Sequence, residues 1–151
     1  MTRPIEFRAW DLDIHKMYQI DTLDIDGGKI TFTHHAMPED TQTRSNCRHL
    51  INYELMQFTG LLDKDNKKIF ERDILKCNGG GKDFFCIVEF EQGCFVAGMP
   101  WIEESISQPE LKYYIGLDYI SVQVIGNIYE NPELMESRRK GGEVIPHDDE
   151  R

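Results

Sequence analysis

Long apolar runs are absent from this 151-residue sequence. No segment approaches the ~18 apolar residues that a membrane-spanning helix needs. The opening MTRPIEFRAW also lacks the apolar core of a signal peptide. The four cysteines, Cys47, Cys77, Cys86 and Cys94, form no C-x-x-C pair. We therefore expect a cytoplasmic protein with reduced thiols and no membrane association.

Basic charge is scarce relative to acidic charge. Seventeen Lys and Arg residues stand against 27 Asp and Glu, which gives a formal net charge of -10. An acidic surface repels phosphate backbones and so disfavours direct binding to nucleic acid. The same surface could instead imitate nucleic acid and occupy a DNA-binding protein, although acidity is common among ordinary soluble proteins. The hydrophobic content of 40% is enough for a packed core.

Motifs for nucleophilic catalysis and for phosphate binding are missing. The sequence contains no G-x-S-x-G stretch. The glycines at 79–81 precede Lys82, but Asp83 follows that lysine, and the spacing differs from that of a phosphate-binding loop. We therefore predict no cofactor.

One cluster offers zinc-type ligands: His34, His35, Cys47 and His49, in the pattern H-H-x11-C-x-H. This spacing matches no established zinc module. Adjacent histidines on a strand also point in opposite directions. We expect a polar loop over residues 34–47 that carries surface histidines, and we keep the cluster as a candidate metal site only.

The stretch DKDNKKIFERDIL, residues 63–75, begins like a calcium loop. Such a loop needs an oxygen ligand, a glycine and a closing glutamate where Lys67, Lys68 and Ile74 stand here. We therefore predict a turn over Asp63–Lys67, with Asn66 able to take a positive φ, followed by a strand over Lys68–Leu75.

The same stretch supplies a candidate catalytic pair. On the predicted strand, Glu71 and Asp73 would face the same side and, with Asp63, could act as acid and base. The competing interpretation is a solvated strand face, with Arg72 and Lys76 supplying opposite charges.

Alternating apolar residues predict strands in IEFRAW, HKMYQI, KITFT, FFCIVEF and CFVAG, separated by turns such as Asp26-Gly27-Gly28 and Glu91-Gln92-Gly93. Residues 48–58 fit a short helical turn followed by a strand. Tyr113–Leu117 and Ile120–Ile125 read as strands, and Asn131-Pro132-Glu133 begins a short helix over Pro132–Ser137. We predict a β-rich extension over residues 1–50, a small β-barrel domain over 51–137 and a disordered tail over 138–151.

Four stretches together resemble one family: IEFRAWD, MQFTGLLDKDNKKIFERDIL, CIVEFEQGCF and VIGNIYENPEL. The chain is similar to the YopX family, small proteins of phages and prophages widespread in Gram-positive bacteria. The resemblance implies a phage or prophage origin and a mainly β fold ending in a small Src-homology-3-like barrel. It implies no established activity and supplies no catalytic residues. The family usually has glycine where Lys67 and Arg72 stand, so we expect a different turn or a shifted bulge there.

The fold class that we predict is mainly β, α+β at most, with N-terminal strands and a hairpin, a small Src-homology-3-like barrel and one or two short helices. The function that we predict is a non-catalytic module that binds a host or phage protein through exposed strand edges and loops. Open edges also favour self-association. The alternatives are an acidic nucleic-acid mimic and an enzyme that uses the carboxylates or the histidine cluster.

Overall fold

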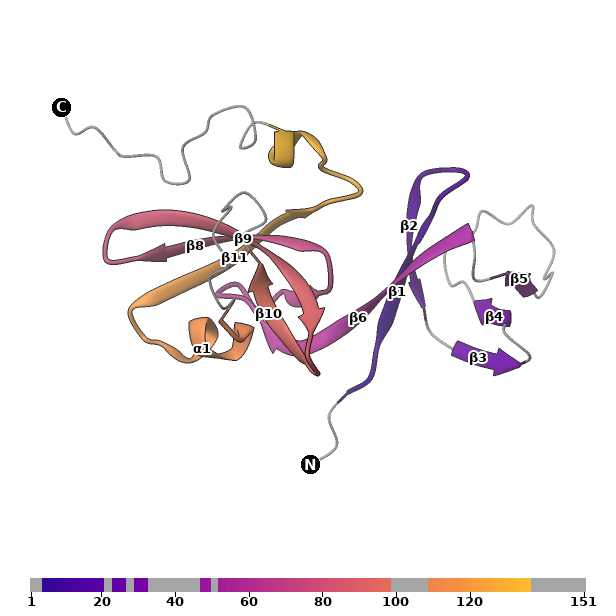
Figure 1. The fold of residues 1–151 in the computed structure, drawn as a ribbon, viewed down its shortest axis with the longest axis horizontal. Helices are drawn as coiled ribbons and strands as arrows, with labels where there is room; N and C mark the ends of the chain where they lie inside the picture. The colour runs from indigo at the N-terminus through magenta and orange to yellow at the C-terminus, as the bar shows by residue number, and fades with distance from the viewer. Residues whose placement is uncertain are drawn as a thin grey trace. The chain divides into compact units, whose positions relative to one another are not determined.

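Antiparallel strands make up most of the computed structural model, shown in Figure 1. It describes residues 4–20, 23–26, 29–32, 47–49, 52–98 and 109–136, with only the backbone for 23–26, 29–32 and 47–49. Two compact units divide the chain, Met1–Phe58 and Thr59–Arg151. The elements are β1 (Phe7–Asp11), β2 (Lys16–Ile20), β3 (Leu23–Asp26), β4 (Lys29–Phe32), β5 (Cys47–His49), β6 (Tyr53–Leu62), β7 (Lys68–Phe70), β8 (Asp73–Gly79), β9 (Lys82–Glu91), β10 (Cys94–Gly98), α1 (Leu111–Gly116) and β11 (Ile120–Asn127).

The first unit contains the predicted N-terminal hairpin. Strand β1 pairs with β2 on one side and with the first part of β6 on the other, both antiparallel. Asp11 closes the hairpin, because its Oδ1 accepts hydrogen bonds from the amides of Asp13 and Ile14. Ala9, Tyr18 and Tyr53 form a small buried cluster between these strands.

A second sheet in this unit has the order β3-β4-β5. The pairing of Asp26 with Lys29 brings the ends of β3 and β4 together, as the predicted turn requires, although the two glycines between them lie outside the described residues. The helical turn predicted at the start of 48–58 is wrong for Arg48 and His49, because both belong to β5 and pair with β4. The strand predicted after it is confirmed as β6.

The second unit is built on a sheet of order β10-β9-β8-β11, which curves into a half-barrel (Figure 1). Helix α1 contacts both outer strands, β10 and β11, so it spans the open side of this curved sheet. The core between them consists of Ile69, Leu75, Cys77, Cys86, Val88, Ala97, Leu111, Val122 and Val124. Two hairpin turns connect these strands, one through Gly80-Gly81 and the predicted one through Gln92-Gly93.

Helix α1 corrects the strand predicted over Tyr113–Leu117. Leu111 is fully buried, and Tyr114 and Ile115 pack against the same core. These three residues have the i, i+3, i+4 spacing of one helical face. The predicted strand begins at Tyr113 and leaves out Leu111. The apolar run that remains fits a strand as well as it fits a helix.

Two further predicted elements agree with the structure, whereas the predicted tail over 138–151 lies outside the described residues. Strand β11 covers the predicted Ile120–Ile125, and residues 133–136 form the helical turn predicted after Pro132. The mainly β fold class, with N-terminal strands, a half-barrel and short helices, is confirmed. Within the described residues, no helix has the length and apolar character needed to cross a membrane.

Candidate functional site

Asp63 is a buried carboxylate that joins a local turn to a distant strand. Its Oδ1 accepts hydrogen bonds from the amides of Asp65 and Lys67, at 2.8 and 2.9 Å. Its Oδ2 accepts the amide of Val124 in β11 at 2.9 Å. Lys64 adds a backbone bond, since its amide donates to the Val122 carbonyl at 2.8 Å. The predicted turn is therefore present, and it is attached to the outer edge of β11.

These hydrogen bonds determine the ionisation of Asp63. Burial raises the pKa of its carboxyl, but the amides of Val124, Lys67 and Asp65, with the Lys67 charge, outweigh burial. The net pKa lies below its ordinary value, because all of these donors favour the charged form. Asp63 thus stays ionised and bonded to the backbone, which is the state of a structural carboxylate.

The predicted strand Lys68–Leu75 is wrong as a single element. Strand β7 ends at Phe70, a turn occupies Glu71 and Arg72, and β8 starts at Asp73. Asp73 is buried, and its Oδ2 accepts the Phe70 amide at 2.8 Å, which closes the turn. Because the turn separates them, Glu71 and Asp73 do not alternate along one strand, and the geometry assumed for a catalytic pair is absent.

Arg72 occupies the corner of this turn in an unusual conformation. Its φ is 65°, a left-handed value that glycine adopts freely and that costs other residues about 1 kcal/mol or more. Two long-range backbone bonds hold it there. The Arg72 amide donates to Val88 at 2.8 Å, and the Ile128 amide donates to the Arg72 carbonyl at 3.1 Å. The corner therefore connects β9 with the segment that follows β11.

That segment is folded around Asn127, a buried residue. The Asn127 Oδ1 accepts the amides of Tyr129 and Glu130, and its Nδ2 donates to the Glu130 carboxylate at 2.8 Å. Asn131 Oδ1 in turn accepts the Asn127 amide. A Cβ at Gly126 would overlap the side chain of Asn131, so glycine is needed for this close approach.

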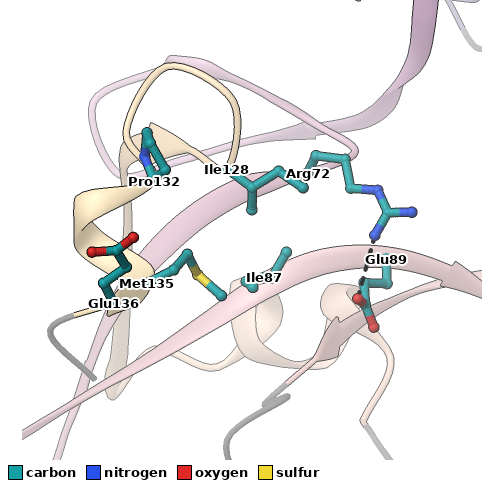
Figure 2. Close-up of a pocket in the computed structure, with 7 residues that line it drawn as sticks. All are labelled: Arg72, Ile87, Glu89, Ile128, Pro132, Met135 and Glu136. Atoms are coloured by element: carbon teal, nitrogen blue, oxygen red, sulfur yellow. Dashed lines mark hydrogen bonds and ion pairs between the residues drawn. The ribbon is translucent and has the colours of Figure 1, made fainter. Parts of the chain in front are cut away.

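A pocket of about 370 Å³ lies between the Arg72 corner, β9 and this segment (Figure 2). Its apolar lining comes from Ile87, Ile128, Pro132 and Met135, and the Met135 side chain points toward Ile87. The charged residues stand at its ends. Figure 2 shows Arg72 and Glu89 facing each other at one end and Glu136 at the other. The volume falls at the lower end of the range for ligand sites, about 300–1,000 Å³.

The charges around the pocket are unequal. Arg72 Nη1 lies 3.4 Å from Glu89 Oε1, and both side chains are partly exposed, so the pair is long and solvated. Glu136 is exposed and forms no ion pair with any residue that the structure describes. The rim of the pocket therefore carries two carboxylates and one guanidinium. The pocket combines an apolar floor with a net negative rim.

Solved structures and family membership place the chain in context. A profile of the YopX protein family matches residues 6–136. The chain belongs to the YopX family. Protein EF1440 from Enterococcus faecalis is 25% identical, with a TM-score of 0.59 over 89% of this chain and 99% of that one. Protein yopX from Bacillus subtilis is 21% identical, with a TM-score of 0.55 over 85% and 96% of the two chains. No curated protein matches the sequence.

Three of the four stretches that identify the YopX family meet at the pocket. Arg72 comes from the middle stretch, Ile87 and Glu89 from CIVEFEQGCF, and Ile128 and Pro132 from VIGNIYENPEL. Sequence reasoning found the stretches but missed the pocket. The signal for the pocket in the sequence was indirect. Gly126, Asn127 and Pro132 indicate a turn, but the neighbouring residues do not show which strand this turn faces.

The two positions where the YopX family usually has glycine differ in outcome. In the first turn the left-handed residue is Asn66, with φ 61°, one position before Lys67. Asn tolerates this conformation better than most residues, and the positive φ predicted for Asn66 is confirmed. In the second turn Arg72 itself is left-handed, and the conformation that suits glycine is kept with a side chain present.

The structure does not describe the side chains of the candidate zinc ligands. His34 and His35 lie outside the described residues, as do the side chains of Cys47 and His49. Among the residues with described side chains, no three His, Cys, Asp or Glu come together as a metal site would require. The histidine cluster stays a prediction.

The two buried thiols of the second unit are not arranged as nucleophiles. The Sγ atoms of Cys77 and Cys86 lie 3.8 Å apart, and both side chains are fully buried. The hydrogen bond between the Cys86 and Cys77 thiols, followed by burial, raises the pKa of the Cys86 thiol well above its ordinary value. Because the thiolate is the reactive form, this environment favours an inert core cysteine.

Proposed function

We propose that this member of the YopX family is a phage- or prophage-encoded protein-binding module without catalytic activity, acting in the cytoplasm of the bacterial host. The pocket of Figure 2 carries the proposal. It is concave, it has an apolar floor with a charged rim, and the backbone hydrogen bonds that Arg72 donates to Val88 and accepts from Ile128 join two of its walls. A preformed apolar depression of this kind is the usual receptor for an anchoring side chain of a protein partner.

The state of the acidic residues weighs against the enzyme alternative. Asp63 and Asp73 accept backbone amides that close turns, so uptake of a proton would break the bonds that hold the fold. A general acid or base must exchange its proton during each cycle. Glu71 lies in the turn between β7 and β8 and does not share a strand with Asp73.

The distribution of charge weighs against the nucleic-acid mimic. Four acidic side chains in the described part of the chain pair with Lys or Arg: Asp65, Asp83, Glu89 and Glu110. A mimic needs an unbroken row of carboxylates at phosphate-like spacing, whereas here opposite charges are interspersed.

The strand edges of the second unit are less open than the sequence predicts. On β11 the carbonyl of Val122 and the amide of Val124 are bonded to the first turn. On β10 the Ala97 amide donates to Pro109, and Val96 bridges to Glu110. Parts of both outer edges of the half-barrel are therefore occupied. This favours the pocket over edge pairing as the docking surface of the second unit.

The test is capture of partners from lysates of phage-infected host cells, followed by binding with each purified candidate. Wild-type protein and the Met135→Asp variant serve as matched baits, with Tyr119→Asp as the control, since Tyr119 is 69% exposed and does not line the pocket. We expect a saturable partner that the wild type and Y119D bind and that M135D loses. Identical capture by all three baits, or no protein bound by any, would contradict the proposal.

A further inference from the structure

The shape of the pocket limits what it can accept. Its walls leave about 370 Å³, lined by Ile87, Ile128, Pro132 and Met135 between the charged ends. This space suits one or two side chains rather than a large cofactor. Transfer of an apolar side chain from water into such a lining is favourable, because apolar surface is removed from water. An apolar residue is therefore the part of a partner that enters the floor.

The charge of the rim limits what can stand beside that residue. Glu89 already faces Arg72, which leaves Glu136 as the carboxylate at the opposite end (Figure 2). An anionic group would meet two carboxylates and only one guanidinium that is already paired. A cationic group placed next to the apolar residue would meet the exposed Glu136. The net charge of -10 adds long-range attraction for a basic segment.

We propose that the pocket binds a protein segment in which an apolar side chain is followed by a lysine or arginine. The apolar side chain lies on Ile87, Ile128 and Met135, and the cationic side chain pairs with Glu136. This inference rests on the proposed function and adds to it the chemistry of the partner. Arg72 and Glu89 form the far end, where Glu89 would repel an acidic residue of the segment.

Methyl NMR titrations of the full-length protein with three capped hexapeptides test this chemistry. The probes are Gly-Ser-Leu-Arg-Ser-Gly, the same peptide with Glu in place of Arg, and the same peptide with Ser in place of Leu. We expect saturable shifts at the Ile87, Ile128 and Met135 methyls, with the tightest binding for the Leu-Arg probe. The Ile74 methyl, which is buried and does not line the pocket, serves as the internal reference.

A charge reversal makes the test specific. In Glu136→Arg, which changes an exposed side chain, the preference between the Leu-Arg and Leu-Glu probes should reverse. The ratio of the two dissociation constants should change roughly fivefold, which is the effect of exchanging a solvent-exposed ion pair for a repulsion. Equal affinity for the two probes, or shifts that spare the pocket methyls, would overturn the proposal.

Two outcomes separate this inference from the function on which it rests. If a captured partner is lost by M135D but retained by E136R, the binding module stands and the basic-residue requirement fails. The chain itself carries Arg138, Arg139, Val144 and Ile145 beyond the described residues. If the Leu-Arg probe binds only after Val144→Ser and Ile145→Ser, the pocket is occupied by the chain's own terminus, and the proposal of a separate partner is overturned.

Discussion

The two turns on either side of β7 are both closed by a buried aspartate, but they are built in different ways. In the first turn, Asp63 bonds the turn amides and the Val124 amide, and the left-handed residue is Asn66. In the second, Asp73 bonds the Phe70 amide, and the left-handed residue is Arg72. The first turn thus places an adaptable residue at its corner, whereas the second places a bulky one where glycine is favoured.

The first turn has a structural role, whereas the second turn places a charged side chain at the rim of the pocket. The side chain of Asn66 is exposed and lines no described pocket, and its turn attaches to the edge of β11. Arg72 carries the cost of its conformation and brings a guanidinium to the rim of the pocket, 3.4 Å from Glu89. Backbone strain of this kind clusters at functional sites, and here it lies at the edge of the pocket.

The largest expected effect comes from breaking the first turn with Asp63→Asn. The amide side chain has one acceptor oxygen in place of two, so its NH2 group must face amide donors either from the turn or from Val124. We expect the free energy of unfolding, measured by urea denaturation at pH 7, to fall by about 2–3 kcal/mol. Asp118→Asn is the control, since Asp118 is exposed and should change stability by less than about 0.5 kcal/mol. A comparable loss in both variants would refute the structural role of Asp63.

The second prediction is the acid dependence of the same bonds. The pKa of Asp63 in the folded protein lies below its ordinary value of 3.8. The stability that ionised Asp63 contributes to the fold is therefore fully present above the ordinary pKa. It is lost as the pH falls through the lowered pKa of the folded protein. The stability difference between wild type and D63N should shrink over this acid range and stay constant from pH 5 to 7 (roughly where the carboxyl is fully ionised). Parallel stability curves down to pH 2 (about the limit of a perturbed carboxyl) would contradict this.

The sequence predicts the first turn and misses the second for a physical reason. Asp63 and Asn66 act on amides within their own turn, so their residue types are sufficient to show it. The second turn is stabilised by the bonds of Arg72 with Val88 and Ile128, which lie far along the chain. The apolar Ile69, Ile74 and Leu75 then read as one strand, because the break between them is set by tertiary contacts.

The same distinction explains the rest of the fold and the site. The hairpins through Gly80-Gly81 and Gln92-Gly93 follow from local turn chemistry and were predictable. Helix α1 was not, because its burial depends on Leu111 meeting a core formed by other strands. The pocket could not be predicted at all. Its walls come from three separate stretches, and only the register of β9 against β8 and the closure of the Asn127 turn bring them together.

The third prediction compares two substitutions at the corner of the second turn. Arg72→Ala and Arg72→Gly both remove the guanidinium, but only alanine keeps a Cβ in the left-handed conformation. We expect the glycine variant to be more stable by about 0.5–1 kcal/mol, since the strain avoided exceeds the added chain entropy. The neighbouring pair Glu71→Ala and Glu71→Gly should show the opposite order, because Glu71 does not have a positive φ. The same order at both positions would remove the argument for strain at Arg72.

The smallest expected effect measures the Arg72–Glu89 pair itself. A double-mutant cycle with Arg72→Met and Glu89→Gln should give a coupling of about 0.2–1 kcal/mol at low salt, because both side chains are partly exposed at a separation of 3.4 Å. The coupling should nearly disappear at 1 M NaCl, where the Debye length is about 3 Å. The D63N effect should persist under the same conditions, because its bonds are short and buried. If salt reduced both effects equally, the two turns would depend on the same kind of electrostatic interaction, and the Arg72–Glu89 pair could not be distinguished as a solvent-exposed contact.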